Sequence, residues 1–194
     1  MENKTDLRGI AIGRFQPFHN GHLVLIKQIL EDCSEALIVV GSAQLNYTMA
    51  NPFTAGERVF MIHKALKDGG FDLSKILIIP LVDEENNAKW FSALVSMLPP
   101  FNIMYSGNDL VITLASQYLE VRPPRFERRK EFNGSYIRNR ILNEQKWSDL
   151  VSRSVFEIIN NIDGVNRMKI LAKYELERRK LNGSGEGCSR DQLN

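Results

Sequence analysis

The chain has little cysteine, no long hydrophobic run and almost no excess of charge. Cys33 and Cys188, its two cysteines, lie far apart, so neither a disulfide framework nor a zinc cage is expected. The longest apolar stretches fall well short of the roughly 18–20 residues that cross a bilayer. Residues 1–9 lack the apolar segment of a signal peptide, and a net charge of +2 does not argue for nucleic acid. These absences predict a protein of the reducing cytoplasm that binds neither membrane nor nucleic acid.

The composition is that of an ordinary globular protein, with 43% hydrophobic and 25% charged residues among 194. Short apolar runs predict strands at residues 9–13, 36–40, 76–81, 102–105 and 119–121. Amphipathic segments between them predict helices at residues 23–33, 54–67 and 88–98, and another from about Asp109. Strands that alternate with helices predict a doubly wound α/β domain with a parallel sheet over residues 1–150.

The strand signal ends near residue 150. Apolar residues then follow helical spacing: Val151, Val155, Ile158, Ile159 and Ile162. A break at Asp163-Gly164 separates them from a second helix that is expected to run to about Lys180. Residues 151–181 therefore form a predicted C-terminal helical appendage of the same domain. Residues 182–194 are polar and rich in glycine, which predicts a flexible tail.

Residues 13–22, GRFQPFHNGH, join the end of the first predicted strand to the start of the first predicted helix. Parallel sheets bind ligands at the carboxyl ends of their strands, and a helix N-terminus favours an anion over a cation. A metal site would need a third ligand nearby, and a plain turn would not explain Arg14. Phosphate binding by Arg14, His19 and His22 is favoured. Gly13 would let the backbone approach the ligand, and Gly21 would let the chain enter the helix beside His22.

The motif GRFQPFHNGH resembles the (T/H)xGH signature of the nucleotidylyltransferase superfamily. NGSYIRNRI at residues 133–141 resembles its second signature, a serine three residues before an arginine. The chain is similar to archaeal-type nicotinamide-nucleotide adenylyltransferases over residues 8–180. The ordered segments that carry this likeness further are GSAQ at 41–44, NPFTAGER at 51–58, NAKW at 87–90, PPF at 99–101 and YSGN at 105–108. The resemblance implies a Rossmann-like fold and the joining of ATP to nicotinamide mononucleotide (NMN), giving NAD and pyrophosphate.

The resemblance also implies roles for individual residues. Contacts to the phosphates are expected from Arg14, His19, His22 and Arg138. The surrounding loop would be shaped by Gly13, Phe15 and Gly21, and Ser135 would cap the helix of Arg138. The adenosine is expected near Gly107 and Asn108, and the nicotinamide on Trp90 with Gly41, Asp83 and Asn87 nearby. Mg²⁺ would arrive with ATP and need no protein ligand, and the assembly would be a homo-oligomer, a hexamer in this family.

Two other functions stay open on the sequence. Adenylyl transfer to another phosphorylated acceptor, such as phosphopantetheine, is disfavoured by Asn87 and Trp90. A non-catalytic NAD- or ATP-sensing module is disfavoured by the intact phosphate-binding motifs. The absence of a GxxxxGK[ST] segment excludes a P-loop.

Three further features receive structural interpretations. His63 lies on the stripe of Val59, Ile62 and Leu66 and is expected in the core. The basic segment 122–130 is expected to lend positive potential to the triphosphate, or to contact another subunit, rather than to read RNA. Relatives often carry a basic residue where Ala50 stands, which puts a phosphate contact from that loop in doubt.

Overall fold

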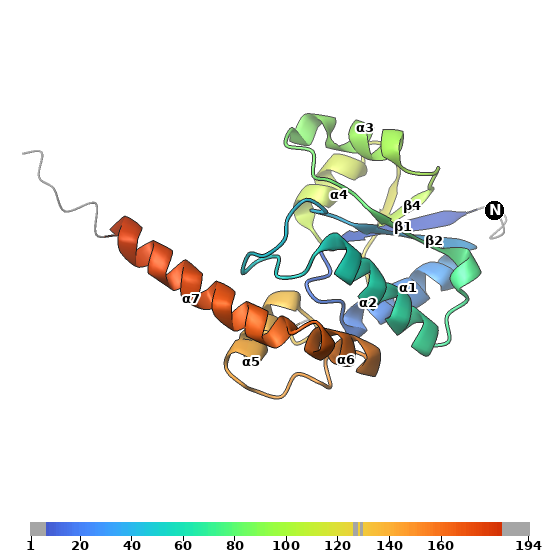
Figure 1. Cartoon of the computed structure of the whole chain (residues 1–194). Helices are drawn as coiled ribbons and strands as arrows, with labels where there is room; N and C mark the ends of the chain where they lie inside the picture. Colours follow the sequence, from blue (N-terminus) through green and yellow to red (C-terminus); the bar gives the residue numbers. More distant parts are fainter. Residues whose placement is uncertain (1–6, 126–127, 129, 184–194) are drawn as a thin grey trace, which may run out of the picture.

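A parallel sheet lies at the centre of the computed structural model, which describes residues 7–125, 128 and 130–183. Its five strands run in the order β3-β2-β1-β4-β5 (Figure 1). They are β1 (Arg8–Gly13), β2 (Glu35–Val40), β3 (Ile76–Pro80), β4 (Ile103–Tyr105) and β5 (Glu120–Arg122). The direction of winding reverses between β1 and β4, so a ligand site is expected where these strands end.

Helices cover both faces of the sheet, as Figure 1 shows. One face carries α1 (Asn20–Asp32) and α2 (Ala55–Asp68), and the other carries α3 (Asn87–Met97) and α4 (Asp109–Ala115). A short 3-10 helix, η2 (Leu73–Lys75), precedes β3. Alternate strand residues enter the two cores, with Ala11, Ile38 and Val40 on one side and Ile10, Leu37 and Val39 on the other. The predicted doubly wound, Rossmann-like parallel sheet is confirmed.

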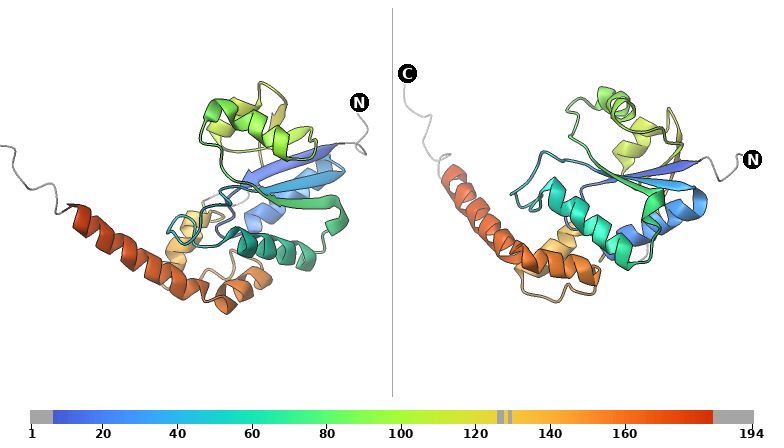
Figure 2. Two further views of the ribbon diagram at one scale, coloured as in Figure 1. Left: turned by 45° about the horizontal axis from the view of Figure 1, so that its top comes forward. Right: turned by 45° about the vertical axis from the view of Figure 1, so that its right-hand side comes forward.

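Three helices follow the sheet: α5 (Gly134–Leu142), α6 (Arg153–Asn161) and α7 (Gly164–Gly183). The α6 helix packs on α2, and the start of α7 is held by Arg167, which donates to the two carboxylate oxygens of Glu57 at 2.8 and 2.9 Å. The rest of α7 extends away from the sheet in both views of Figure 2. This helix continues through Gly183, two residues into the predicted tail, and residues 184–194 lie outside the described part. None of the described helices is long and apolar enough to span a bilayer.

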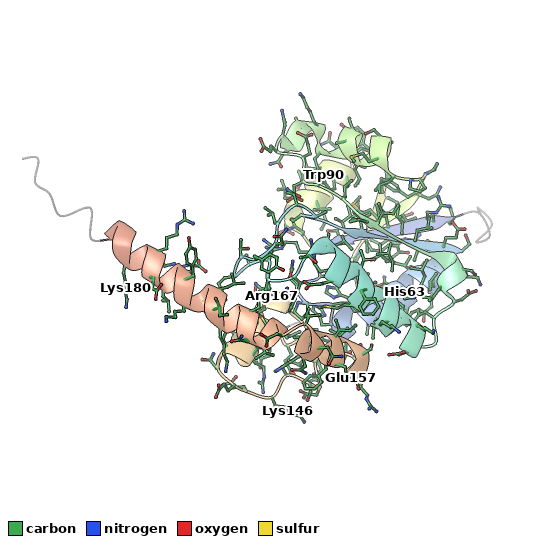
Figure 3. All side chains as sticks on the ribbon, viewed as in Figure 1. His63, Trp90, Lys146, Glu157, Arg167 and Lys180 are labelled. Atoms are coloured by element: carbon green, nitrogen blue, oxygen red, sulfur yellow. The ribbon has the colours of Figure 1, made fainter. Side chains whose placement is uncertain are left out.

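The α2 helix buries a different stripe from the predicted one. Its buried residues are Arg58, Met61, Ile62, Ala65 and Leu66, which follow the i, i+3, i+4, i+7, i+8 pattern. His63, marked in Figure 3, lies about 100° from Ile62 around the helix and is exposed. The expectation that His63 lies in the core was wrong. The inward face of α2 includes Arg58, which hydrophobic patterning would assign to the outside, and His63 therefore falls on another face.

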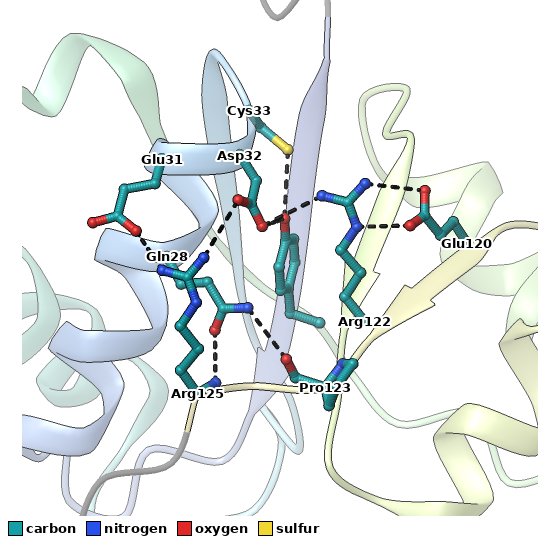
Figure 4. A network of polar contacts seen from close by, with 9 residues as sticks. Gln28, Glu31, Asp32, Cys33, Glu120, Arg122, Pro123 and Arg125 are labelled. Atoms are coloured by element: carbon teal, nitrogen blue, oxygen red, sulfur yellow. Dashed lines mark hydrogen bonds and ion pairs between the residues drawn. The ribbon is translucent and has the colours of Figure 1, made fainter. Parts of the chain in front are cut away.

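A polar network fastens the segment after β5 to α1 (Figure 4). The buried side chain of Gln28 donates to the carbonyl of Pro123 at 3.2 Å and accepts from the amide of Arg125 at 2.7 Å. The Tyr105 hydroxyl donates to Asp32 at 2.8 Å. Burial and that carboxylate raise the pKa of Tyr105 above its usual range, so the phenol stays a donor. The network fixes where the chain starts toward α5.

The described arginines of the basic segment are paired with carboxylates. Arg122 contacts Asp32 and Glu120, Arg125 contacts Glu31, and Arg128 pairs with Glu131. Residues 126, 127 and 129 lie outside the described part. These ion pairs offset much of the positive charge that the sequence assigns to this segment. Arg122 and Arg125 thereby attach the segment to α1.

Two glycines provide a test of how closely the chain packs at the start of α5. A Cβ at Gly134 would lie 2.8 Å from the carbonyl oxygen of Gln16, a backbone atom that cannot rotate away, whereas a Cβ at Gly56 meets nothing within 4 Å. Gly134→Ala is expected to lower the free energy of unfolding by about 1–3 kcal/mol. Gly56→Ala is expected to raise it by about 0.4–1 kcal/mol. Urea denaturation of the two variants measures both changes, and equal stabilities would contradict the close approach.

Candidate functional site

The first histidine motif forms the junction of β1 and α1. Gly13 ends β1, and a Cβ there would lie 3.1 Å from the ring of Phe15. Phe15 has a φ of 50°, a left-handed conformation that costs a residue with a Cβ about 1–2 kcal/mol. The strained turn buries the Phe15 ring, which meets the His22 ring edge-on at 4.7 Å between centroids. A strained residue is therefore held directly against the second histidine.

The α1 helix begins at Asn20, earlier than predicted, with His19 at its N-cap and His22 in its first turn. The two imidazole rings stack with centroids 3.6 Å apart and planes 18° apart. The backbone N–H of His19 donates to Nδ1 of His22 at 3.1 Å. Since Nδ1 accepts this bond, a neutral His22 carries its proton on Nε2. The fold thus selects the tautomer of His22 that can donate through Nε2.

Burial makes both rings neutral. Burial lowers the pKa of His19 from its ordinary 6.5 to about 4, against a smaller opposite effect of a backbone hydrogen bond. Burial, together with the nearby His19, lowers the pKa of His22 well below its usual range. Nδ1 of His19 is buried and has no hydrogen-bond partner among the described residues. This nitrogen faces inward at the N-terminus of α1, where His19 and His22 form a reciprocal capping box, so the other ring nitrogen, Nε2, is the one left for a ligand.

The second motif reaches the same place from α5. Asn133, not Ser135, caps this helix, and its side chain accepts from the amides of Ser135 and Tyr136. The predicted cap was wrong because both residue types suit the position and the helix begins two residues earlier than a cap at Ser135 would require. Ser135 instead accepts from Arg138 at 3.1 Å, and Arg138 also donates to the Gln16 carbonyl at 2.7 Å. The two motifs are therefore hydrogen-bonded to each other.

A cleft of about 180 Å³ lies between the N-termini of α1 and α5. Its walls bring together the predicted phosphate contacts Arg14, His19, His22 and Arg138 with Phe15 and Ser135, and no carboxylate of the described residues lines it. Burial lowers the pKa of Arg138 to about 10, and repulsion from Arg14 contributes. Two cations that repel each other beside two helix N-termini form a site for a polyanion. Across the described residues, no three His, Cys, Asp or Glu side chains gather to hold a metal.

A second, smaller cavity of about 40 Å³ lies at the neighbouring strand ends. It is lined by the predicted acceptor residues Gly41, Asp83 and Trp90, together with Glu84 and apolar side chains. Asp83 accepts from the backbone N–H of Ser42 at 2.9 Å, which ties the segment after β3 to the end of β2. Trp90, marked on α3 in Figure 3, is half-buried and also packs on the core of that face. Trp90 therefore lines the cavity and contributes to the core of that face at once.

Other predicted residues line neither cavity. Asn108 caps α4 by accepting from two amides, and Gly107 precedes it after β4. Asn87 is exposed as the first residue of α3. Gly21 lies behind the cleft, where a Cβ would come within 2.8 Å of the Phe132 Cβ. Ala50 lines a separate cavity against α7.

Two residues that hold the site were missed from the sequence. The Gln16 side chain donates to the carbonyl of Phe53 at 2.8 Å and accepts from the backbone N–H of Phe53 at 3.0 Å. The sequence around Gln16 contains no pattern that predicts this contact. Arg58 is fully buried beneath the site. The sequence did contain a pattern that could have identified Arg58, because this residue stands at the first position of the stripe that α2 buries.

The histidine environments predict how the free protein titrates. Because the pKa values of His19 and His22 lie below 6.5, both rings stay neutral as the pH falls from 8 to 5.5. Imidazole ¹H–¹⁵N correlation spectra should show neutral rings throughout, with the His22 proton on Nε2. The His63→Gln variant removes the third histidine and so assigns the remaining signals. An imidazolium pattern from either residue at pH 6, or a proton on Nδ1 of His22, would contradict the geometry.

The chain matches the cytidylyltransferase-like family over residues 10–155. It is 47% identical to the nicotinamide-nucleotide adenylyltransferase of Methanolobus tindarius over 174 residues, which covers 89% of this chain and 98% of that protein. It is 46% identical to the corresponding protein of Methanococcus aeolicus over 166 residues, which covers 85% and 95%.

Among solved structures, the chain resembles a bifunctional NMN adenylyltransferase/ADP ribose pyrophosphatase of Francisella tularensis, crystallised with AMP and a manganese ion. The TM-score is 0.73 at 22% identity, and the match covers 97% of this chain but 58% of that longer one. This likeness concerns the fold alone. The family match and the high identity across nearly the whole length of two relatives go further: the chain belongs to the cytidylyltransferase-like family, among the nicotinamide-nucleotide adenylyltransferases.

Proposed function

We propose that this chain transfers the adenylyl group of ATP to NMN, giving NAD and pyrophosphate, in the cleft between α1 and α5. The observation that carries the proposal is the lining of that cleft, which among the described residues combines two arginines and two neutral histidines with no carboxylate. Relatives that are 40–47% identical are named as enzymes of this reaction. ATP is a polyanion at neutral pH and NMN carries an anionic phosphate, and such a cleft favours phosphate groups.

The reaction requires the protein to position the two substrates and to offset their negative charge. The 5′-phosphate of NMN attacks the α-phosphorus of ATP in line, a new P–O bond forms, and the bond to the β-phosphate breaks as pyrophosphate leaves. The phosphate is already an anionic nucleophile and needs no general base. The barrier lies in bringing two anions together and in stabilising charge on the transferring phosphoryl group.

Each cleft residue has a role in that scheme. His22 donates from Nε2 to an oxygen of the α-phosphate, and its neutral state keeps it a donor without a change of protonation. Arg138 places its positive charge beside the β- and γ-phosphates, and Ser135 orients the Arg138 guanidinium. Arg14, exposed at the mouth of the cleft, bridges the two substrates. His19 holds a further phosphate oxygen.

A divalent cation belongs to the reaction as a partner of ATP. Mg²⁺ suits this role because it keeps several waters and binds phosphate oxygens without a protein cage. The described lining of the cleft fits that delivery, since it has four groups to hold the phosphates and no carboxylate to hold the ion. Mg²⁺ bound with ATP would supply positive charge to the pyrophosphate, while Arg138 and the histidines hold the phosphates.

The acceptor would occupy the second cavity. Trp90 offers an aromatic surface for the nicotinamide, with Gly41 allowing close approach and Asp83 beside it. Asn87 begins the same helix as Trp90 and would bond at its edge, and the adenosine would lie toward Gly107 and Asn108. The hexameric assembly and the cytoplasmic location stay predictions.

The second cavity favours an amide over an acid. Asp83 and Glu84 line it, and none of the arginines or lysines in the described part of the chain does. A nicotinic acid ring would bring a third negative group toward these carboxylates, whereas an amide can donate its N–H groups to them. We therefore propose that the chain uses NMN in preference to nicotinic acid mononucleotide. Glu84 is the better residue to test, because Asp83 also holds the Ser42 amide.

The first functional prediction concerns His22. His22→Ala is expected to lower kcat by about a hundredfold or more, which is typical for the loss of one donor to the transition state. His63→Ala is the matched control, since that ring is exposed outside the cleft lining. Pyrophosphate release from ATP, with NMN and Mg²⁺, measures both. Turnover of His22→Ala within a fewfold of wild type would remove the proposed role.

The second prediction concerns acceptor choice. Wild type should release pyrophosphate faster with NMN than with nicotinic acid mononucleotide, as a ratio of kcat/KM. Glu84→Gln should reduce that ratio about fivefold, since a like charge about 4 Å away contributes about 1 kcal/mol when water screens it fully. Glu85→Gln, an exposed neighbour that does not line the cavity, should leave the ratio unchanged.

Other outcomes of the acceptor assay are equally informative. Faster release with phosphopantetheine would overturn the acceptor assignment, and no release with any acceptor would favour a sensing module. A ratio that Glu84→Gln leaves unchanged would contradict the proposed origin of selectivity while leaving the reaction itself in place.

A further inference from the structure

Arg58 is a fully buried cation with an unusual set of partners. Its side chain is 0% exposed, although it rises from α2 beneath the site. The guanidinium donates to the carbonyls of Arg14 at 2.9 Å, Gly41 at 2.8 Å and Ser42 at 3.0 Å, and Nε donates to the carbonyl of Thr54 at 3.2 Å. All four acceptors are main-chain oxygens.

The carbonyls that Arg58 binds belong to the segments that form the two cavities. Arg14 follows β1, and its side chain lines the phosphate cleft. Gly41 follows β2 and lines the second cavity. The next residue, Ser42, gives its amide to Asp83, a further wall of that cavity. One planar group with fixed geometry therefore bonds the main chain on both sides of the site.

The charge of Arg58 fits this position. Burial lowers its pKa, the nearby Asp83 carboxylate raises it, and the Arg14 guanidinium lowers it. The guanidinium therefore interacts with a carboxylate, Asp83, on the acceptor side and with a cation, Arg14, on the phosphate side. A buried charge needs compensation, and here carbonyl dipoles supply most of it. A methionine of similar length would fill the space but bond none of these carbonyls.

We propose that Arg58 is a positioning residue that sets the distance between the phosphate cleft and the acceptor cavity. The proposal rests on the function proposed above, because in-line attack requires both substrates at a fixed separation. Arg58 does not line either cavity, so it acts through the Arg14 loop and the Gly41-Ser42 turn. A misplacement of about 1 Å between reacting groups can cost roughly a hundredfold in rate.

The test compares Arg58→Lys with Arg167→Lys. Arg167 is a suitable control because it also ties α2 to another element by a guanidinium, through Glu57, the neighbour of Arg58 in sequence. Lysine keeps the charge at both positions but cannot bond several carbonyls in fork geometry. Both variants should unfold at lower urea concentrations. Arg58→Lys should also lower kcat by tenfold or more and raise KM for both substrates, whereas Arg167→Lys should keep its kinetic constants per folded molecule.

A double-mutant cycle separates positioning from general destabilisation. If Arg58 acts through Arg14, the loss of kcat/KM caused by Arg14→Ala should be smaller in the Arg58→Lys background than in wild type. Additive losses, or kinetic constants of Arg58→Lys within twofold of wild type, would overturn the proposal. The wild-type assay with NMN reports on the proposed function itself, so that its failure is distinct from a failure of the inference.

Discussion

The site depends on one loop, residues 14–19, being held from two sides. The carbonyl of Gln16 accepts a hydrogen bond from Arg138. The side-chain amide of Gln16 donates to the carbonyl of Phe53 and accepts from its backbone N–H. These contacts span 122 and 37 residues, so the loop between β1 and α1 is set by segments distant in sequence. Gly134 permits the approach because a Cβ there would strike the same carbonyl. Without this junction, the two motifs would form separate turns on one sheet edge.

The electrostatics of the cleft follow from that junction. Drawing α5 onto the β1–α1 loop buries Arg138 near Arg14 and encloses the two histidines, so burial and repulsion weaken the hold of these groups on their protons. Under the proposed function, a polyanion would relieve the repulsion between the two arginines. The neutral histidines would then supply directed hydrogen bonds and the arginines would supply charge.

Much of the fold could be predicted from sequence, since strands buried on both faces leave continuous apolar runs. The motif residues of the phosphate cleft could also be predicted, because they lie within two short segments. The start of α1 was placed too late because Asn20 and Gly21 are poor helix formers, although the first turn tolerates them. Gln16 was missed because its contact with the distant main chain of Phe53 leaves no local trace in the sequence. Arg58 was missed although it falls on the buried stripe of α2, because an arginine is not normally assigned to a core position.

The two halves of the site are specified by different means. The phosphate cleft is built from charged groups and helix ends whose positions are fixed by hydrogen bonds, whereas the acceptor cavity depends on a half-buried tryptophan and two carboxylates. The ends of β1 and β2 are joined beneath both cavities by the Gly41 amide, which donates to the carbonyl of Gly13 at 2.9 Å, and by Arg58. Under the proposed function, transfer between the two ligands needs a fixed separation, and this connection would set it.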